Sequence, residues 1–207
     1  MKENKNREKT YKIVLYGLLF AMILILGITP LASIHVGTIE ITLVMIPVAV
    51  GAIVMGPWAG AILGGFFGLT SFMQCIGIGV TSAFGATLLS ISPAYTMILC
   101  FVPRILMGFL VGLIYQLMSK AIKKNVINCA AASLLSALLN TVFFMTLLML
   151  LFGKTEFIMG FRGEMKLLPF IVAFVGLNGL VEMIVATVIG TAVSAALVRY
   201  LKNPDHR

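Results

Sequence analysis

The chain has 207 residues, of which 60% are apolar and only 11% carry a charge. Soluble globular proteins are about half apolar and about a quarter charged, so this composition excludes an ordinary soluble domain and predicts a membrane protein. Lysine and arginine outnumber aspartate and glutamate by 15 to 7. Because these basic residues cluster beside apolar runs, we expect the excess to orient membrane spans rather than to bind nucleic acid.

The apolar runs predict an all-α integral membrane protein, a single domain over residues 1–207 with six transmembrane helices. The predicted spans cover residues 13–34, 41–55, 58–74, 94–118, 126–152 and 169–201. The second would cover only about 22 Å, less than the roughly 30 Å hydrocarbon core, so it must stop short, tilt or thin the bilayer. We interpret the uncharged, glycine- and serine-rich residues 75–92 as an irregular loop, and residues 153–168 as a charged loop.

Six spans place both chain termini on one side of the membrane. Eleven of the fifteen basic residues fall on that side, three fall in the loop 153–168 on the other side, and Arg104 stands inside a span. The positive-inside rule therefore predicts that both termini are cytoplasmic. The external connections near 35–40, 75–92 and 153–168 are longer or more elaborate than the internal ones, which is typical of loops that recognise a ligand.

Two stripes of small residues indicate close helix contacts. The third span carries a glycine at every fourth position, at Gly56, Gly60, Gly64 and Gly68, a spacing that lets another helix approach closely. We interpret this stripe as packing within the monomer. A second stripe, Gly17 and Ala21, lies on the first span near its cytoplasmic end, and it predicts either packing within the monomer or contact with a partner subunit.

Charged side chains inside spans are costly, about 2.5–3.5 kcal/mol on insertion scales, and mark functional sites by default. Counted inward from the external ends of their spans, Arg104, Asn140 and Asn178 lie at one level, about 15–18 Å below the outer surface. Glu182 follows Asn178 by four residues and shares its helix face. This level predicts a pocket for a small polar or anionic solute, because arginine grips a carboxylate through two parallel hydrogen bonds. The alternative is an Arg104–Glu182 ion pair, with the asparagines tying helices together.

Four further polar residues lie toward the outside. Thr70, Ser71 and Gln74 stand at the outer end of the third span, where they either complete the lining of the pocket or cap the helix end. His35 lies in the first external loop, and it belongs either to an ordinary surface or to a loop that closes over a bound solute.

No catalytic centre is expected. The chain has no HExxH, GxSxG or nucleotide-binding motif, so any active transport must be powered by a partner or an ion gradient. The single aspartate, Asp205, and the two histidines, His35 and His206, are too few for an intramembrane metal centre, and we expect neither a metal nor a cofactor. We interpret the three cysteines, which form no CxxC pair, as buried free thiols: Cys75, Cys100 and Cys129.

One family combines these features. The second and third spans are short and are joined by Gly56-Pro57, and the fourth span reads Val102-Pro103-Arg104-Ile-Leu-Met-Gly108. Nearly the whole chain resembles the substrate-binding S component of an energy-coupling factor (ECF) vitamin transporter. The stretch Ile46-Pro47-Val-Ala-Val-Gly51-Ala-Ile-Val-Met-Gly56-Pro57, followed by Gly64-Gly-Phe-Phe-Gly68-Leu-Thr-Ser71-Phe, is most similar to the pantothenate-specific members.

The resemblance implies that the chain captures a water-soluble vitamin outside a bacterial cell and takes part in its ATP-driven uptake. The implied partners are a transmembrane coupling protein and two cytoplasmic ATPases, with the lipid bilayer around them. In the family, small residues spaced by four on the first span contact the coupling protein, and here these are Gly17 and Ala21. Pantothenate carries a carboxylate, hydroxyls and an amide, for which Arg104, Asn140 and Asn178 offer partners.

Other assignments stay open at this point. An S component for riboflavin, folate or pyridoxine shares much of this layout. A stand-alone secondary carrier would need ion-coupling sites and often has internal repeats, and no convincing repeat relates the two halves of the sequence. A small membrane enzyme would need a nucleophile or a metal set, for which only His35 and nearby hydroxyls offer a start.

Overall fold

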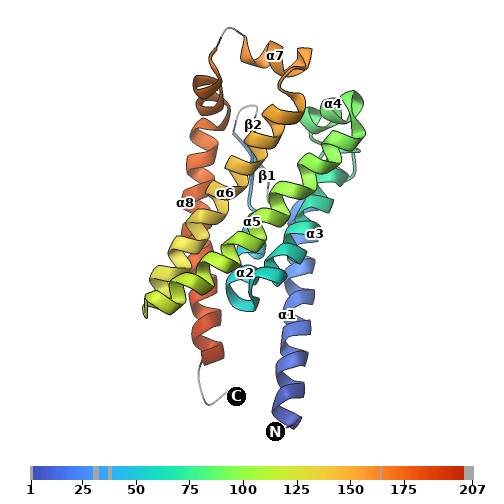
Figure 1. The fold of residues 1–207 in the computed structure, drawn as a ribbon. Coiled ribbons are helices and arrows are strands. Elements are labelled where there is room, and N and C mark those ends of the chain that lie inside the picture. The colour runs from blue at the N-terminus through green and yellow to red at the C-terminus, as the bar shows by residue number, and fades with distance from the viewer. Residues whose placement is uncertain (1, 30–32, 37–38, 164, 203–207) are drawn as a thin grey trace.

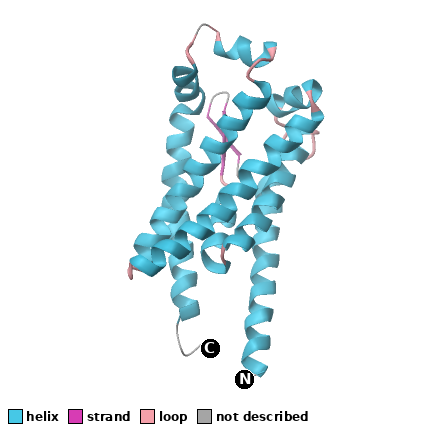
Figure 2. Ribbon diagram, in the orientation of Figure 1, coloured by secondary structure: helices cyan, strands magenta, loops and turns pink. Residues whose placement is uncertain are grey.

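The computed structural model describes residues 2–29, 33–36, 39–163 and 165–202, of which the side chains of 2–9, 33–36, 39–42, 167–168, 170–175, 177–178 and 202 are not described. The described chain is a helical bundle (Figure 1). Its larger helices are α1 (Lys2–Ile28), α2 (Met45–Met55), α3 (Pro57–Cys75), α5 (Pro93–Ala121), α6 (Asn125–Phe152) and α8 (Leu167–Lys202). The shorter elements are α4 (Ala83–Ile91), α7 (Glu156–Arg162) and the antiparallel strands β1 (Ser33–Val36) and β2 (Ile39–Thr42), which form a hairpin (Figure 2).

Within the described residues, four helical segments are long and apolar enough to cross a membrane: Thr10–Ile28, Pro93–Ala121, Asn125–Phe152 and Gly179–Leu201. These segments confirm the prediction of a membrane protein built from α-helices. The count of six spans stays a prediction. The start of α1 and the end of α8 lie at one end of the bundle, while α4 and α7 lie at the other (Figure 1). The cytoplasmic position of the first of these ends also stays a prediction.

Helix α2 is a short interior helix. It has 11 residues, which at a rise of about 1.5 Å per residue cover about 16 Å, less than the roughly 30 Å hydrocarbon core. It contacts α1, α3, α5, α6 and α8, and the side chains from Met45 to Ile53 are all buried. An apolar sequence without a polar face is what a helix needs when it is surrounded on all sides. The helix is shorter than the predicted run 41–55, because β2 includes the first two residues of that run. Which of the three alternatives holds in a bilayer stays a prediction.

The connections at the end opposite the termini contain more secondary structure than the sequence analysis predicted. The interpretation of residues 75–92 as an irregular loop is wrong for α4, which begins where the Ser82 hydroxyl accepts a hydrogen bond from the Gly85 N–H at 3.2 Å. The interpretation of residues 153–168 as a loop is wrong for α7, where the Thr155 hydroxyl accepts from the Ile158 N–H at 3.4 Å. Side-chain capping of this kind stabilises short helices that have little hydrophobic periodicity.

The first predicted span ends earlier than expected. Helix α1 stops at Ile28, and the hairpin occupies residues that were predicted to end the first span and begin the second. Its strand β2 contacts α8, so the hairpin belongs to the bundle and is not a free surface loop. Proline disfavours a helical conformation in the residue before it, which is a physical reason for the helix to end ahead of Pro30.

Helices α3 and α5 make the most extensive contact between elements in the described bundle. A Cβ atom added at Gly60 would lie 2.1 Å from the Gly108 carbonyl oxygen, and one added at Gly64 would lie 2.2 Å from the Arg104 carbonyl oxygen. At Gly68 the nearest atom would be the Cys100 carbonyl oxygen, at 2.8 Å. The glycine stripe therefore lets two backbones touch, which confirms its interpretation as packing within the monomer.

Helix α8 is broken near its N-terminal end. Gly176 has φ 24° and ψ −127°, which interrupts the regular helix. The positive φ places this residue in a region that side chains with a Cβ rarely adopt. The single predicted span 169–201 is therefore two helical pieces joined at Gly176, and the break lies two residues before Asn178.

Candidate functional site

The predicted site is organised around Arg104, and Pro103 sets the position of its side chain. Proline has no N–H, so Pro103 cannot donate the helical hydrogen bond to the Leu99 carbonyl four residues earlier. The Arg104 Nη1 donates to this carbonyl oxygen instead, at 2.7 Å. Pro103 thus leaves the Leu99 carbonyl oxygen without a backbone donor, and the side chain of the next residue, Arg104, supplies one.

Two aromatic rings on other helices contact the guanidinium of Arg104. The guanidinium carbon lies 5.3 Å from the ring centroid of Phe67 on α3 and 5.0 Å from that of Phe144 on α6. A cation next to the negative face of an aromatic ring is stabilised electrostatically, more strongly where water is excluded. Sequence analysis missed both phenylalanines. The available signal was the presence of aromatic residues on neighbouring apolar spans, which does not specify a partner.

Arg104 still has hydrogen-bonding capacity to offer. Its Nε is buried and has no hydrogen-bond partner among the described residues. The guanidinium has five N–H donors, and only the bond from Nη1 to Leu99 is made within the described structure. A buried donor without a partner costs about 1–3 kcal/mol, so this arrangement is suited to an acceptor brought by a ligand.

The other residues of the predicted level lie on α6 and α8. Asn140 is one helical turn from Phe144, and its Oδ1 is buried without a hydrogen-bond partner among the described residues. Glu182 on α8 lies close enough to Arg104 for an electrostatic interaction. The Asn178 backbone is in α8, but its side chain lies outside the described residues. The structure thus brings Arg104 together with two aromatic rings. Its grouping with Asn140, Asn178 and Glu182 into one binding site stays a prediction.

Thr70 and Gln74 contact α1. The Gln74 Nε2 donates to the Gly27 carbonyl oxygen at 2.8 Å. The Thr70 hydroxyl donates to the Phe67 carbonyl oxygen at 2.9 Å, and a Cβ atom added at Gly27 would lie 2.6 Å from the Thr70 Cβ. These contacts give both side chains a role in joining α3 to α1, a role that sequence analysis did not assign to them.

Ser71 and His35 complete the predicted set. Ser71 follows Phe67 by one helical turn, is half-buried, and accepts a hydrogen bond from the Cys75 thiol through its carbonyl oxygen at 3.3 Å. The His35 backbone lies in β1, and its side chain lies outside the described residues. Their participation in substrate binding stays a prediction.

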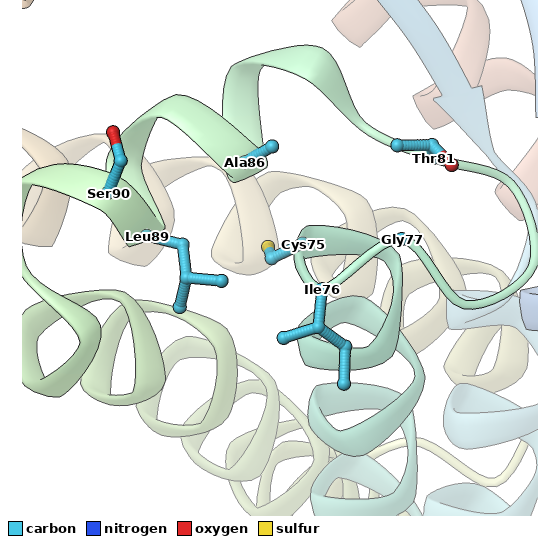
Figure 3. Close-up of a pocket in the computed structure, with 7 residues that line it drawn as sticks. All are labelled: Cys75, Ile76, Gly77, Thr81, Ala86, Leu89 and Ser90. Atoms are coloured by element: carbon cyan, nitrogen blue, oxygen red, sulfur yellow. The ribbon is translucent and has the colours of Figure 1, made fainter.

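A separate hollow lies between the end of α3 and α4. It has a volume of about 440 Å³ and is lined by Cys75, Ile76, Gly77, Thr81, Ala86, Leu89 and Ser90 (Figure 3). None of the predicted site residues lines it. Figure 3 shows the Cys75 sulfur directed from the end of α3 toward α4.

The predicted partner-contact residues lie on an open helix face. Gly17 and Ala21 are exposed on α1, and a Cβ atom added at Gly17 would meet nothing within 4 Å. Leu18 and Met22 beside them are exposed as well. This face therefore has room for another helix and makes no contact within the described bundle that explains its small residues.

Comparisons with known proteins identify the family of this chain. The family described as ECF transporter, substrate-specific component, matches residues 11–194. The crystal structure of an S component for biotin from an ECF-type ABC transporter has the same fold, with a TM-score of 0.59 at 18% identity, and the match covers 96% of this chain and 94% of that one.

Two relatives are similar over most of their length. The pantothenate transporter PanT of Leuconostoc mesenteroides subsp. mesenteroides is 28% identical over 204 residues, which are 96% of this chain and 95% of the relative. The pantothenic acid transporter PanT of Lactococcus lactis subsp. cremoris is 30% identical over 173 residues, which are 78% of this chain and 80% of the relative. Because the family match extends over most of the sequence, the chain belongs to the substrate-specific components of ECF transporters, which are transport proteins and not enzymes.

Proposed function

We propose that this S component binds pantothenate outside the cell and serves its ATP-driven uptake. Both named relatives are pantothenate transporters. The observation that carries the proposal is the guanidinium of Arg104, whose buried Nε has no partner among the described residues. A pantothenate carboxylate would accept hydrogen bonds from this group, and charge-assisted bonds of this type are among the strongest in proteins.

The remaining groups of pantothenate have chemically suitable partners nearby. The unpartnered Oδ1 of Asn140 would accept a hydrogen bond from a hydroxyl or amide of the ligand. Asn178 and Glu182 would contribute from α8, and Ser71 from the next turn of α3 above Phe67. The dimethyl-bearing carbon skeleton of pantothenate would contact the rings of Phe67 and Phe144, which also hold Arg104.

The decisive test is the binding of a panel of vitamins to the purified, detergent-solubilised chain, measured by calorimetry. Pantothenate, riboflavin, folate, thiamine, biotin and pyridoxine are compared at equal concentration. We expect tight binding of pantothenate alone. Tight binding of another vitamin would contradict the assignment of the substrate, and binding of none would return the secondary carrier to consideration.

We further propose the membrane arrangement and the partners. The chain would cross a bacterial plasma membrane six times with cytoplasmic termini, an orientation supported by its distribution of basic residues. The family implies that two cytoplasmic ATPases would hydrolyse ATP and that a transmembrane coupling protein would transmit its energy to this chain, which has no nucleotide-binding motif of its own. The open face of α1 at Gly17 and Ala21 would contact this coupling protein.

The Ala21→Leu substitution tests this partner surface. A leucine on the open face of α1 would leave the bundle intact but hold a second helix away, because close helix approach in membranes needs small residues. We expect unchanged pantothenate binding and loss of co-purification with the coupling protein. The matched control is Ala192→Leu, at another exposed alanine on the long helix α8, for which assembly should be retained. If Ala21→Leu still co-purifies with the coupling protein, the coupling protein contacts a different surface of this chain.

A further inference from the structure

A pair of thiols joins α3 to α5 beside the proposed substrate site. The sulfur atoms of Cys75 and Cys100 lie 3.9 Å apart, and both residues are buried. Cys100 is one helical turn from Arg104, and both cysteines lie close enough to this arginine for an electrostatic interaction. The third cysteine, Cys129, is fully buried on α6.

The position of Cys75 allows the two sulfurs to approach further. A disulfide needs a sulfur–sulfur distance of about 2.05 Å, so roughly 2 Å of closure would be required. Cys75 is the last residue of α3, and the turn that follows contains Gly77 and Gly79, both with positive φ. The backbone at Cys75 can therefore shift while α4, the next helix, keeps its position.

The hollow between the end of α3 and α4 gives small molecules a route to this pair. Cys75 lines this hollow, and the Cys100 sulfur lies 3.9 Å from the Cys75 sulfur. Helix α4, which contributes Ala86, Leu89 and Ser90 to the lining, lies at the end of the bundle opposite the start of α1 and the end of α8 (Figure 1). With cytoplasmic termini this end would be extracellular, where disulfides form and persist.

We propose that Cys75 and Cys100 are a redox-active pair that closes to an intramolecular disulfide when a small organic disulfide enters the hollow. The Cys75 thiolate attacks one sulfur of the reagent and releases the first reagent thiolate. The Cys100 thiolate then attacks the Cys75 sulfur of the mixed disulfide and releases the second. The two cysteines lose two electrons and two protons, and the reagent gains them and leaves as two thiols.

The disulfide would reduce substrate binding. It would pull the end of α3 toward α5 next to Arg104, and Phe67 on α3 is one of the two rings that hold the guanidinium. This consequence rests on the proposed function, whereas formation of the disulfide does not. An effect of about tenfold on the pantothenate dissociation constant is typical of coupling between two sites.

The test treats the purified full chain with bis(2-hydroxyethyl) disulfide. We expect the intact mass to fall by two hydrogens, a cross-linked peptide containing Cys75 and Cys100, and about tenfold weaker pantothenate binding, all reversed by dithiothreitol. Cys75→Ser and Cys100→Ser should prevent the cross-link and make binding insensitive to the reagent. Cys129→Ala is the matched control and should respond like the unchanged chain.

Two results would overturn the proposal: a chain that forms no internal disulfide in the mass measurement, or a disulfide that leaves pantothenate binding unchanged. The mass measurement uses the unchanged chain, so it does not depend on the folding of any variant. A chain that forms the disulfide but binds no pantothenate when reduced would support the thiol pair and contradict the proposed function.

Discussion

Replacing Arg104 with alanine is expected to abolish most of the affinity for pantothenate. Among the described residues, the substitution removes the one charged donor with a buried, unpartnered N–H, and it leaves the ligand carboxylate without this counter-charge. Truncating one partner of a buried, hydrogen-bonded charge pair costs about 2–5 kcal/mol, which is a factor of roughly 30 or more in Kd. Calorimetry on the purified variant measures this directly.

A structural role of Arg104 must be separated from its role in binding. Arg104→Ala also leaves the Leu99 carbonyl without a donor, because Pro103 has no N–H to offer. The double variant Pro103→Ala, Arg104→Ala restores a backbone N–H for this carbonyl and serves as the folding control. We expect the double variant to melt at a higher temperature than Arg104→Ala and still to bind pantothenate weakly.

Arg104→Lys tests whether charge alone is sufficient. Lysine keeps the positive charge, but it cannot present two parallel donors to a carboxylate, so we expect intermediate affinity. Survival of tight binding in Arg104→Ala would instead favour the structural alternative, in which Arg104 pairs with Glu182. In that case Glu182→Gln should lower the melting temperature without changing pantothenate affinity.

The features predicted well from the sequence are those encoded by local patterns. The glycine spacing of four on α3 specifies a close helix contact without any knowledge of its partner, and α5 proves to be that partner. The apolar run before Gly56 was recognised as shorter than the hydrocarbon core is thick, because helix length follows directly from residue number. The adjacent Pro103 and Arg104 were identified as a motif, although their shared use of the Leu99 carbonyl was not.

The features that were missed depend on weak or non-local signals. Gly176 stands in a continuous apolar run, where nothing in the pattern distinguishes a break from a tolerated glycine. Helix α7 has seven residues, too few for a visible periodicity, and only its Thr155 cap indicates it. Thr70 and Gln74 share one end of α3 with Ser71, but whether each faces α1 or a pocket depends on how α3 is rotated against its neighbours.

Gly64→Val is expected to disrupt both the bundle and the site. Even a Cβ atom at this position would lie 2.2 Å from the Arg104 carbonyl oxygen and 3.1 Å from the Ile105 Cα, and neither backbone can rotate away like a flexible side chain. Overpacking of this type typically costs about 1–3 kcal/mol, and here it would also push Arg104 away from Phe67. We expect a melting temperature lower by several degrees and weaker pantothenate binding, measured by thermal unfolding and calorimetry.

The neighbouring glycine provides the matched control for this substitution. A Cβ atom added at Gly65 would meet only the Ile105 Cγ1, at an ordinary 3.9 Å, so Gly65→Ala should be tolerated. Because alanine favours a helix over glycine by up to about 1 kcal/mol, its melting temperature should be equal or slightly higher. Equal stability of Gly64→Val and Gly65→Ala would show that α3 and α5 do not meet through their backbones at this point. The position of Arg104 would then need a different explanation from the one that the glycine contact provides.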